Sequence, residues 1–90
     1  MTADKLSSQI GYDFLIKGLS KKTYNFQAHN IKYRLNVQYT GAGVEFVLYE
    51  NKTVIPLQPN LELIFEETYD SAYVNSNLYL ICKQVLSKVI

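Results

Sequence analysis

The chain is poor in several residues that commonly carry chemistry. Its 90 residues include one cysteine, one histidine, two prolines and no tryptophan. A lone cysteine cannot form a disulfide within the chain, and one histidine with one cysteine cannot complete a usual zinc site. Nine basic and eight acidic residues nearly cancel, so the net charge selects neither nucleic acid nor a membrane surface as a partner. We expect no metal, no cofactor and a core that closes without crosslinks.

Long apolar runs are also missing. No segment approaches the roughly 18 apolar residues of a membrane-spanning helix. The opening residues MTADK lack the apolar stretch of a signal peptide. These absences predict a cytoplasmic protein with no membrane association. Eight lysines against one arginine, with seven asparagines and seven isoleucines, reflect AT-rich codons and indicate a low-GC bacterial host or one of its phages.

The first element expected from the pattern is a helix over residues 3–17. Its apolar residues recur every fourth position, which is typical of one helix face. They are Leu6, Ile10 and Phe14. Thr2 is a suitable N-cap, and Gly18 can supply the left-handed residue that ends the helix.

The period then changes from four to two, which predicts strands at 23–28, 31–39 and 44–50. The short turns His29-Asn30 and Thr40–Gly43 fix the register, because a slip of one residue would turn the apolar side chains to the wrong face. The expected apolar pairs are Ala28–Ile31, Phe26–Tyr33, Tyr24–Leu35, Tyr39–Val44, Val37–Phe46 and Leu35–Leu48.

The same reasoning extends the sheet beyond residue 50. Asn51-Lys52 is interpreted as a two-residue hairpin loop, followed by a strand at 53–57 that pairs Leu48 with Ile55 and Phe46 with Leu57. Gln58-Pro59-Asn60 is interpreted as a second loop. Residues 61–66 then form a fifth strand or, alternatively, open a helix capped by Asn60. In the strand interpretation, the side chains that face inward are Leu61, Leu63 and Phe65, whereas Glu62 and Glu66 point away.

The last element is a helix over about 71–89, with Asp70 or Asn75 as its N-cap. Its apolar stripe consists of Val74, Leu78, Ile81, Cys82, Val85 and Val89. The predicted fold for residues 1–90 is therefore a single α+β domain. It is a two-layer sandwich in the order helix, antiparallel meander of four or five strands, helix, with both helices on one face of the sheet.

Motifs for catalysis are scarce. Gly41-Ala42-Gly43 resembles part of a nucleotide-binding loop, but a strand follows it where such a loop requires a helix. Cys82 falls in an apolar helical stripe, where cysteine behaves as a small hydrophobic residue. His29 falls in a turn. We predict that the protein is not an enzyme, and a small-ligand carrier or enzyme with a pocket between helices and sheet is kept as an alternative.

Two surfaces are candidate protein-binding sites. The first is the outer face of the sheet, where an apolar centre with an arginine and a polar rim has the anatomy of a binding patch. Its candidate residues are Lys32, Arg34, Val47, Tyr49 and Val54. Tyr49 lies opposite Arg34 in the expected register, which permits cation–π stacking. The alternative is that these apolar residues serve strand propensity alone.

The second candidate surface is acidic and could dock a basic partner. Its residues are Glu62, Glu66, Glu67 and Asp70. The spacing does not match a calcium loop, and a solvated face is the alternative interpretation.

Charge is segregated along the chain, with a net +4 over residues 1–40 and −3 over residues 41–90. The basic part favours nucleic-acid binding as an alternative function. The order of elements resembles that of a double-stranded-RNA-binding domain, which places lysines where its last helix begins. Here Glu66, Glu67 and Asp70 occupy that region and would repel phosphate.

Together these patterns predict a small non-catalytic module that binds a protein partner of unknown identity. A phage- or mobile-element-encoded inhibitor or adaptor that occludes its partner is the hypothesis that best suits this size and composition. A homodimer through the last helix or a sheet edge is a further hypothesis.

Overall fold

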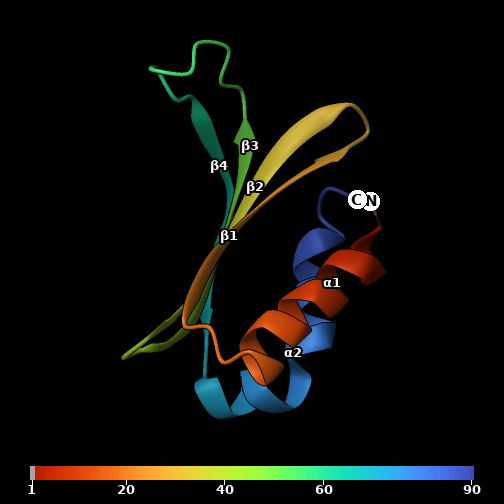
Figure 1. Ribbon diagram of the computed structural model, residues 1–90, viewed down its shortest axis with the longest axis vertical. Coiled ribbons are helices and arrows are strands. Elements are labelled where there is room, and N and C mark those ends of the chain that lie inside the picture. The colour runs from red at the N-terminus through yellow and green to blue at the C-terminus, as the bar shows by residue number, and fades with distance from the viewer. Residues whose placement is uncertain (1) are drawn as a thin grey trace.

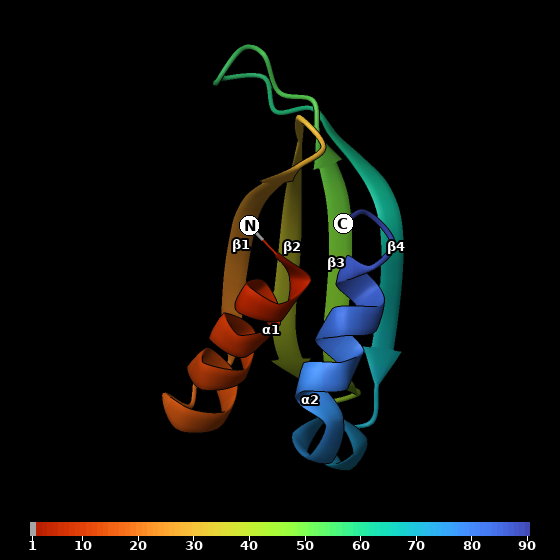
Figure 2. The same ribbon diagram turned by 90° about the vertical axis from the view of Figure 1, so that its right-hand side faces the viewer.

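The computed structural model describes residues 2–90 and has two helical segments on one side of a four-stranded sheet (Figure 1). The elements in chain order are α1 (Ala3–Gly11), the π-helical turn η1 (Tyr12–Ile16), β1 (Lys21–Ala28), β2 (Ile31–Thr40), β3 (Gly43–Asn51), β4 (Leu61–Tyr69) and α2 (Ser71–Leu86). The strands are antiparallel neighbours in the order β1-β2-β3-β4. Figure 2 shows both helices in front of the same face of the sheet. The predicted α+β sandwich is confirmed.

The register of the first three strands is also confirmed. Tyr24 pairs with Leu35 between β1 and β2, and Leu35 pairs with Leu48 between β2 and β3. The alternation of apolar and polar residues therefore places one row of side chains against the helices, as expected for a sheet with one buried face. The other four pairs expected in these two hairpins are present as well.

The prediction of a strand at 53–57 is wrong. Residues 52–60 form a loop without regular strand structure, and the partner of β3 is β4. Leu48 pairs with Phe65 rather than with Ile55, and Phe46 pairs with Glu67 rather than with Leu57. The physical reason is length, because β4 follows β3 over nine residues, whereas the apolar run before Gln58 offers only five.

The strand interpretation of residues 61–66 is confirmed, and β4 continues to Tyr69. A bulge interrupts the register at Leu48 and Tyr49, so that Tyr49 pairs with Leu63. One extra residue exchanges the two faces of a strand. Leu61 and Leu63 therefore lie on the outer face and Glu62 lies on the inner face. The expectation that the two leucines face inward and that Glu62 points away is wrong.

The first helix changes geometry before it ends. The α-helix gives way to a π-helical turn in which Lys17 N–H donates to Tyr12 O at 3.0 Å. The turn brings Asp13 beside Phe14 into the interior, and both side chains are buried. Gly18 then adopts φ 70°, as expected for the residue that ends this helix.

The carboxylate of Asp13 holds this helix to the sheet. It accepts hydrogen bonds from Lys22 Nζ at 2.9 Å, Tyr24 Oη at 2.8 Å and Gln9 Nε2 at 3.1 Å. Burial acts to raise the pKa of Asp13, but these three donors and the Lys22 charge outweigh burial and hold that pKa below its ordinary value. The carboxylate is therefore ionised inside the fold and fully provided with partners.

The second helix begins at a side-chain cap. Asp70 accepts hydrogen bonds from the backbone of Ala72 and Tyr73, which satisfies free N–H groups of the first turn. The helix ends at Leu86, three residues before the predicted end, and Val89 and Ile90 fold back to donate to Leu86 O. The side chains that it buries completely or nearly so are Val74, Leu78, Ile81, Cys82, Val85 and Leu86.

Candidate protein-binding surface

The outer face of the sheet carries no helix (Figure 2), yet its apolar centre is not available to a partner. Val47 is only 4% exposed. Tyr49 is half-buried. The predicted apolar centre of this patch is therefore mostly hidden within the face.

Arg34 lies opposite Tyr49 in the register, as expected. Its guanidinium, however, is directed across the neighbouring strand, where Nε donates to Asn25 Oδ1 at 3.1 Å. Lys32 pairs in register with Gln27 at the end of the same hairpin and is exposed. These cations border the outer face beside β1 and do not surround a common apolar centre.

Val54 lies outside the sheet, because the strand that was expected to carry it does not form. It belongs to the loop of residues 52–60, which we call the apolar loop, and its side chain is 90% exposed. Ile55 and Leu57 of the same loop are 54% and 92% exposed. The sequence pattern did not reveal this surface, although two prolines within an apolar run argue against a paired strand.

Hydrogen bonds at the base of the apolar loop fix its path. Lys52 N–H donates to Asn60 O at 2.8 Å, and Asn60 N–H donates to Thr53 Oγ1 at 2.9 Å. Farther out, Gln58 N–H donates to Ile55 O at 2.9 Å and closes a turn around Pro56. Hydrogen bonds therefore hold the backbone that carries these apolar side chains. Figure 1 shows that the loop projects beyond the sheet.

More apolar surface lies on the first residues of β4, where Leu63 is 54% exposed and Ile64 is 41% exposed. Both follow the apolar loop directly in the chain and lie at the same end of the β3–β4 hairpin. We call these two residues and the three exposed residues of the loop the apolar tip. They are Val54, Ile55, Leu57, Leu63 and Ile64.

Two polar grooves flank the base of the apolar loop. One, of about 410 Å³, is lined by both strands of the β1–β2 hairpin and by Asn51, and it contains Lys32 and Arg34. The other, of about 320 Å³, contains Lys32, Glu50 and Lys52. These grooves give the apolar tip a charged and hydrogen-bonding border on one side.

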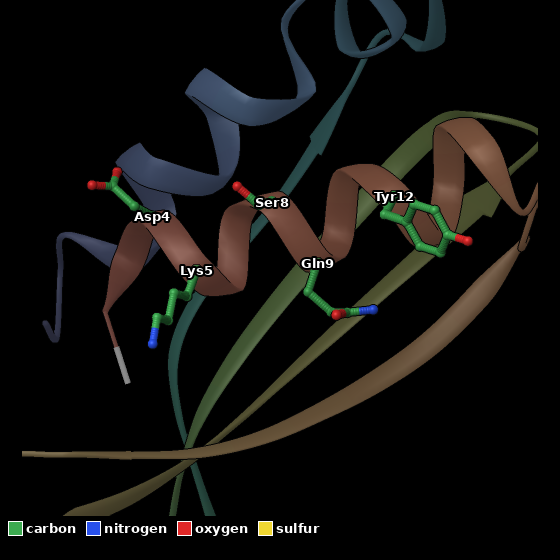
Figure 3. A pocket seen from close by; sticks show the side chains of 5 residues that line it. All are labelled: Asp4, Lys5, Ser8, Gln9 and Tyr12. Atoms are coloured by element: carbon green, nitrogen blue, oxygen red, sulfur yellow. The ribbon is translucent and has the colours of Figure 1, made fainter.

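A further hollow of about 490 Å³ lies on α1 between Asp4 and Tyr12. Figure 3 shows its five side chains spaced along the helix and pointing outward rather than toward one centre. The arrangement does not form a site with convergent polar groups, which a small-molecule pocket normally has.

The four acidic residues singled out in the sequence do not form one cluster. Asp70 is used as the cap of α2, and Glu62 makes an ion pair with Lys52 at the base of the apolar loop. Glu66 shares the outer face with Val47, whereas Glu67 shares the inner face with Phe46 at the rim of the sheet. Glu66 and Glu67 are both exposed. Among residues 2–90, no group of three or more histidine, cysteine or acidic side chains is placed to hold a metal ion.

The basic residues of the first half are likewise dispersed. Lys21 and Lys32 occupy opposite ends of the β1–β2 hairpin, and Lys22 is bound to Asp13. A phosphate backbone would require several free cations along one track, which these positions do not provide.

Cys82 and His29 lie in very different surroundings. Cys82 is fully buried in α2, and burial raises the pKa of its thiol to about 12. A reactive cysteine needs the opposite shift. His29 is exposed in the turn between β1 and β2. Cys82 therefore serves packing, as its position in the apolar stripe indicated.

The structure is that of a small α+β protein whose two most exposed large apolar side chains, Val54 and Leu57, lie in the loop of one hairpin. No protein-family model, curated protein or solved structure matches the chain. Over the residues that the structure describes, no helix is both long and apolar enough to cross a lipid bilayer.

Proposed function

We propose that this chain is a non-catalytic protein-binding module and that the apolar tip is its contact surface. The observation that carries the proposal is the exposure of Val54 and Leu57, at 90% and 92%, on a loop whose base is held by hydrogen bonds. Apolar side chains gathered at one exposed place mark interaction surfaces in soluble proteins.

The form of the loop suits insertion into a concave partner. Its two prolines and its internal hydrogen bonds limit the conformations available before binding, which lowers the entropy lost on association. Leu57 at the exposed turn would act as an anchor, and the polar grooves beside Lys32 and Lys52 would form the rim. When this loop occupies the apolar cleft of a partner protein, other ligands can no longer bind in that cleft.

The charges near the loop favour a protein over a lipid surface. Lys52 is already paired with Glu62, and Glu50 lies opposite Glu62 in the register. A membrane-inserting loop is normally bordered by unpaired lysine and arginine. An inhibitor or adaptor encoded by a phage or mobile element, acting in the cytoplasm of a bacterial host, is the biological role that we propose for this module.

Affinity capture with matched variants tests the proposal. The immobilised chain is exposed to lysate of the host, and the retained proteins are compared for the wild type, V54D/L57D and I16D. Ile16 is an exposed apolar residue of η1, at 71%, so that I16D controls for loss of apolar surface elsewhere. We expect a specific protein to be retained by the wild type and I16D and lost with V54D/L57D.

A photo-crosslinking residue at position 57 should join the chain to the same protein, and one at position 16 should not. Capture that is unaffected by V54D/L57D, or that is lost equally with I16D, would contradict the assignment of the apolar tip.

A further inference from the structure

The outermost strand beside the apolar tip has a free backbone edge. β4 is hydrogen-bonded to β3 on one side only, and nothing in Thr2–Ile90 adds a strand to its other side (Figure 2). Its nine residues span about 30 Å at the usual rise of a strand. The alternate N–H and C=O groups along that edge are available to another extended chain.

The two edges of the sheet differ in how far they are protected. β1 begins with Lys21 and Lys22, and edge lysines discourage pairing with other chains. β4 contains neither lysine nor proline. Its bulge lies toward the apolar tip, whereas the stretch from Phe65 to Tyr69 keeps a regular register with β3. This stretch is the part of the edge that is suited to pairing.

The side chains along this stretch carry negative charge. Glu66 and Glu67 point to opposite faces and are exposed. The three ion pairs within the described chain, Lys22–Asp13, Lys52–Glu62 and Lys83–Asp4, involve neither of them. Glu45 adds a further carboxylate on the outer face opposite Thr68. The nearby cation is Lys88, which lies 4.6 Å from the centre of the Phe65 ring.

We infer that the free edge of β4 receives an extended, basic segment of a partner protein, which adds a fifth strand to the sheet. The inference rests on the proposed function, since it names the chemistry of the partner. Lysine or arginine side chains on both faces of the added strand would meet Glu66 and Glu67. Apolar side chains toward one end would meet Leu63 and Ile64. A second copy of β4 fits poorly, because antiparallel pairing would bring these glutamates close to their own counterparts.

Synthetic peptides test the edge without knowledge of the natural partner. The probe is a fluorescein-labelled nine-residue peptide in which pairs of lysines alternate with pairs of valines, so that lysine lies on both faces of the strand. It is compared with a peptide that has glutamate in place of lysine. Fluorescence anisotropy should show the glutamate peptide binding at least about tenfold more weakly, as expected when like charges oppose one another. Amide shifts in an NMR titration should change along Phe65–Tyr69 and not along β1. Equal binding of both peptides, or shifts confined to β1, would overturn the inference.

Backbone pairing is separated from simple charge attraction by N-methylation. A strand added to an edge donates through alternate N–H groups only. Methylating one alternate set of peptide nitrogens should therefore abolish binding, while methylating the other set should leave it nearly unchanged. If both methylated peptides bind as well as the unmodified one, no strand is added and the inference fails.

Matched variants of the chain complete the test. E66Q/E67Q removes two negative charges from β4, and S8K/Q27K adds two positive charges at exposed positions elsewhere, so both variants change the net charge equally. Affinity for the lysine peptide should fall by about tenfold or more in the first variant and by much less in the second. Equal losses would overturn the inference. Retention of a partner that depends on Leu57, together with no peptide binding, would reject the edge and leave the proposed function standing.

Discussion

Two hairpins close at the same end of the sheet (Figure 1). They differ in whether their ends pack into the core. The β1–β2 hairpin closes in a two-residue turn, and its inner face carries Phe26 and Tyr33, whose stacked rings are 5.5 Å apart and nearly buried. The β3–β4 hairpin closes in the nine-residue apolar loop. Its inner face at the same level carries Glu50 opposite Glu62.

This difference explains why one hairpin packs and the other projects. Burying aromatic rings away from water lowers the free energy of the folded state. The end of the β1–β2 hairpin therefore packs into the core beneath the helices. Burying two opposed carboxylates is unfavourable, because each loses its hydration. The ion pair of Glu62 with Lys52 is exposed to solvent. The end of the β3–β4 hairpin therefore stays in water and extends its apolar loop away from the core.

The largest expected effect is the difference in stability between variants of a buried and of an exposed apolar residue. Phe26→Ala should lower the free energy of unfolding by about 3 kcal/mol, because it leaves a cavity beside Tyr33. Leu57→Ala should change it by less than about 0.5 kcal/mol, because Leu57 touches solvent on nearly all sides. Urea denaturation monitored by circular dichroism measures both. A large loss for Leu57→Ala would mean that the loop packs against the domain and is not displayed.

The second effect concerns the buried carboxylate of Asp13, which is hydrogen-bonded to Lys22 and Tyr24 of β1. Asp13→Ala should cost about 2–3 kcal/mol, because Lys22 and Tyr24 lose their buried acceptor. The folded pKa of Asp13 lies below its ordinary value of 3.8. Its contribution to stability is therefore complete above about pH 5 and is lost as the pH falls through the folded pKa.

Stability curves between neutral and acidic pH test this dependence. Asp13→Asn should flatten the curve in the acidic range. Asp4→Asn serves as the control, because Asp4 also has a lowered pKa, caused by hydrogen bonds from Lys83 and Tyr79 at the surface. If Asp13→Asn leaves the acid limb unchanged while Asp4→Asn removes it, the buried network is not the source of the dependence.

The third expected effect is an increase in stability. His29 and Asn30 have φ of 54° and 65°, a left-handed conformation that Asn-Gly adopts more readily than His-Asn. H29N/N30G should raise the free energy of unfolding by about 1 kcal/mol. Asn60→Gly, in the other hairpin, should give no gain, because Asn60 does not have a positive φ. Thermal unfolding of the two variants compares the turns directly, and equal gains would mean that the left-handed conformation of residues 29 and 30 is not the source of the effect.

The smallest expected effect is at the base of the apolar loop. Lys52→Ala removes an exposed ion pair with Glu62 and should leave the midpoint of thermal unfolding nearly unchanged. Thr53→Val, which removes the hydroxyl acceptor of Asn60 N–H, should instead loosen the loop. Amide hydrogen exchange at residue 60 should be faster in Thr53→Val than in Lys52→Ala. The reverse order would assign the closure of the loop to the ion pair.

The fold could be predicted from the sequence where the determining contacts are local. The alternation over residues 31–39 and the short turns on either side were enough to pair β1 with β2 and β2 with β3. The caps at Thr2 and Asp70 and the left-handed Gly18 were likewise identified from residue type and position. In each case, one or two neighbouring residues determine the conformation.

The fold could not be predicted from the sequence where it depends on contacts between distant segments. Residues 53–57 have good strand propensity, but β3 can pair on that side with only one strand, and the longer β4 occupies the position. The bulge beside Tyr49 then exchanged the faces of Leu61 and Leu63. Of the expected outer-face site, Arg34 and Tyr49 are neighbours, Val47 is covered and Val54 lies in the loop. The four acidic residues do not form one surface, because Asp70 caps α2, Glu62 pairs with Lys52, and Glu66 and Glu67 lie on opposite faces of β4.

The sequence by itself determined the order of elements, the register of three strands and the face that each of them turns to the core, because periodicity and turn chemistry act between near neighbours. Only the tertiary structure decided which strand follows β3, that Asp13 lies buried among its donors, and that the apolar loop and the edge of β4 remain uncovered. Those outcomes depend on competition between segments for one sheet edge and on the limited area that two helices can cover.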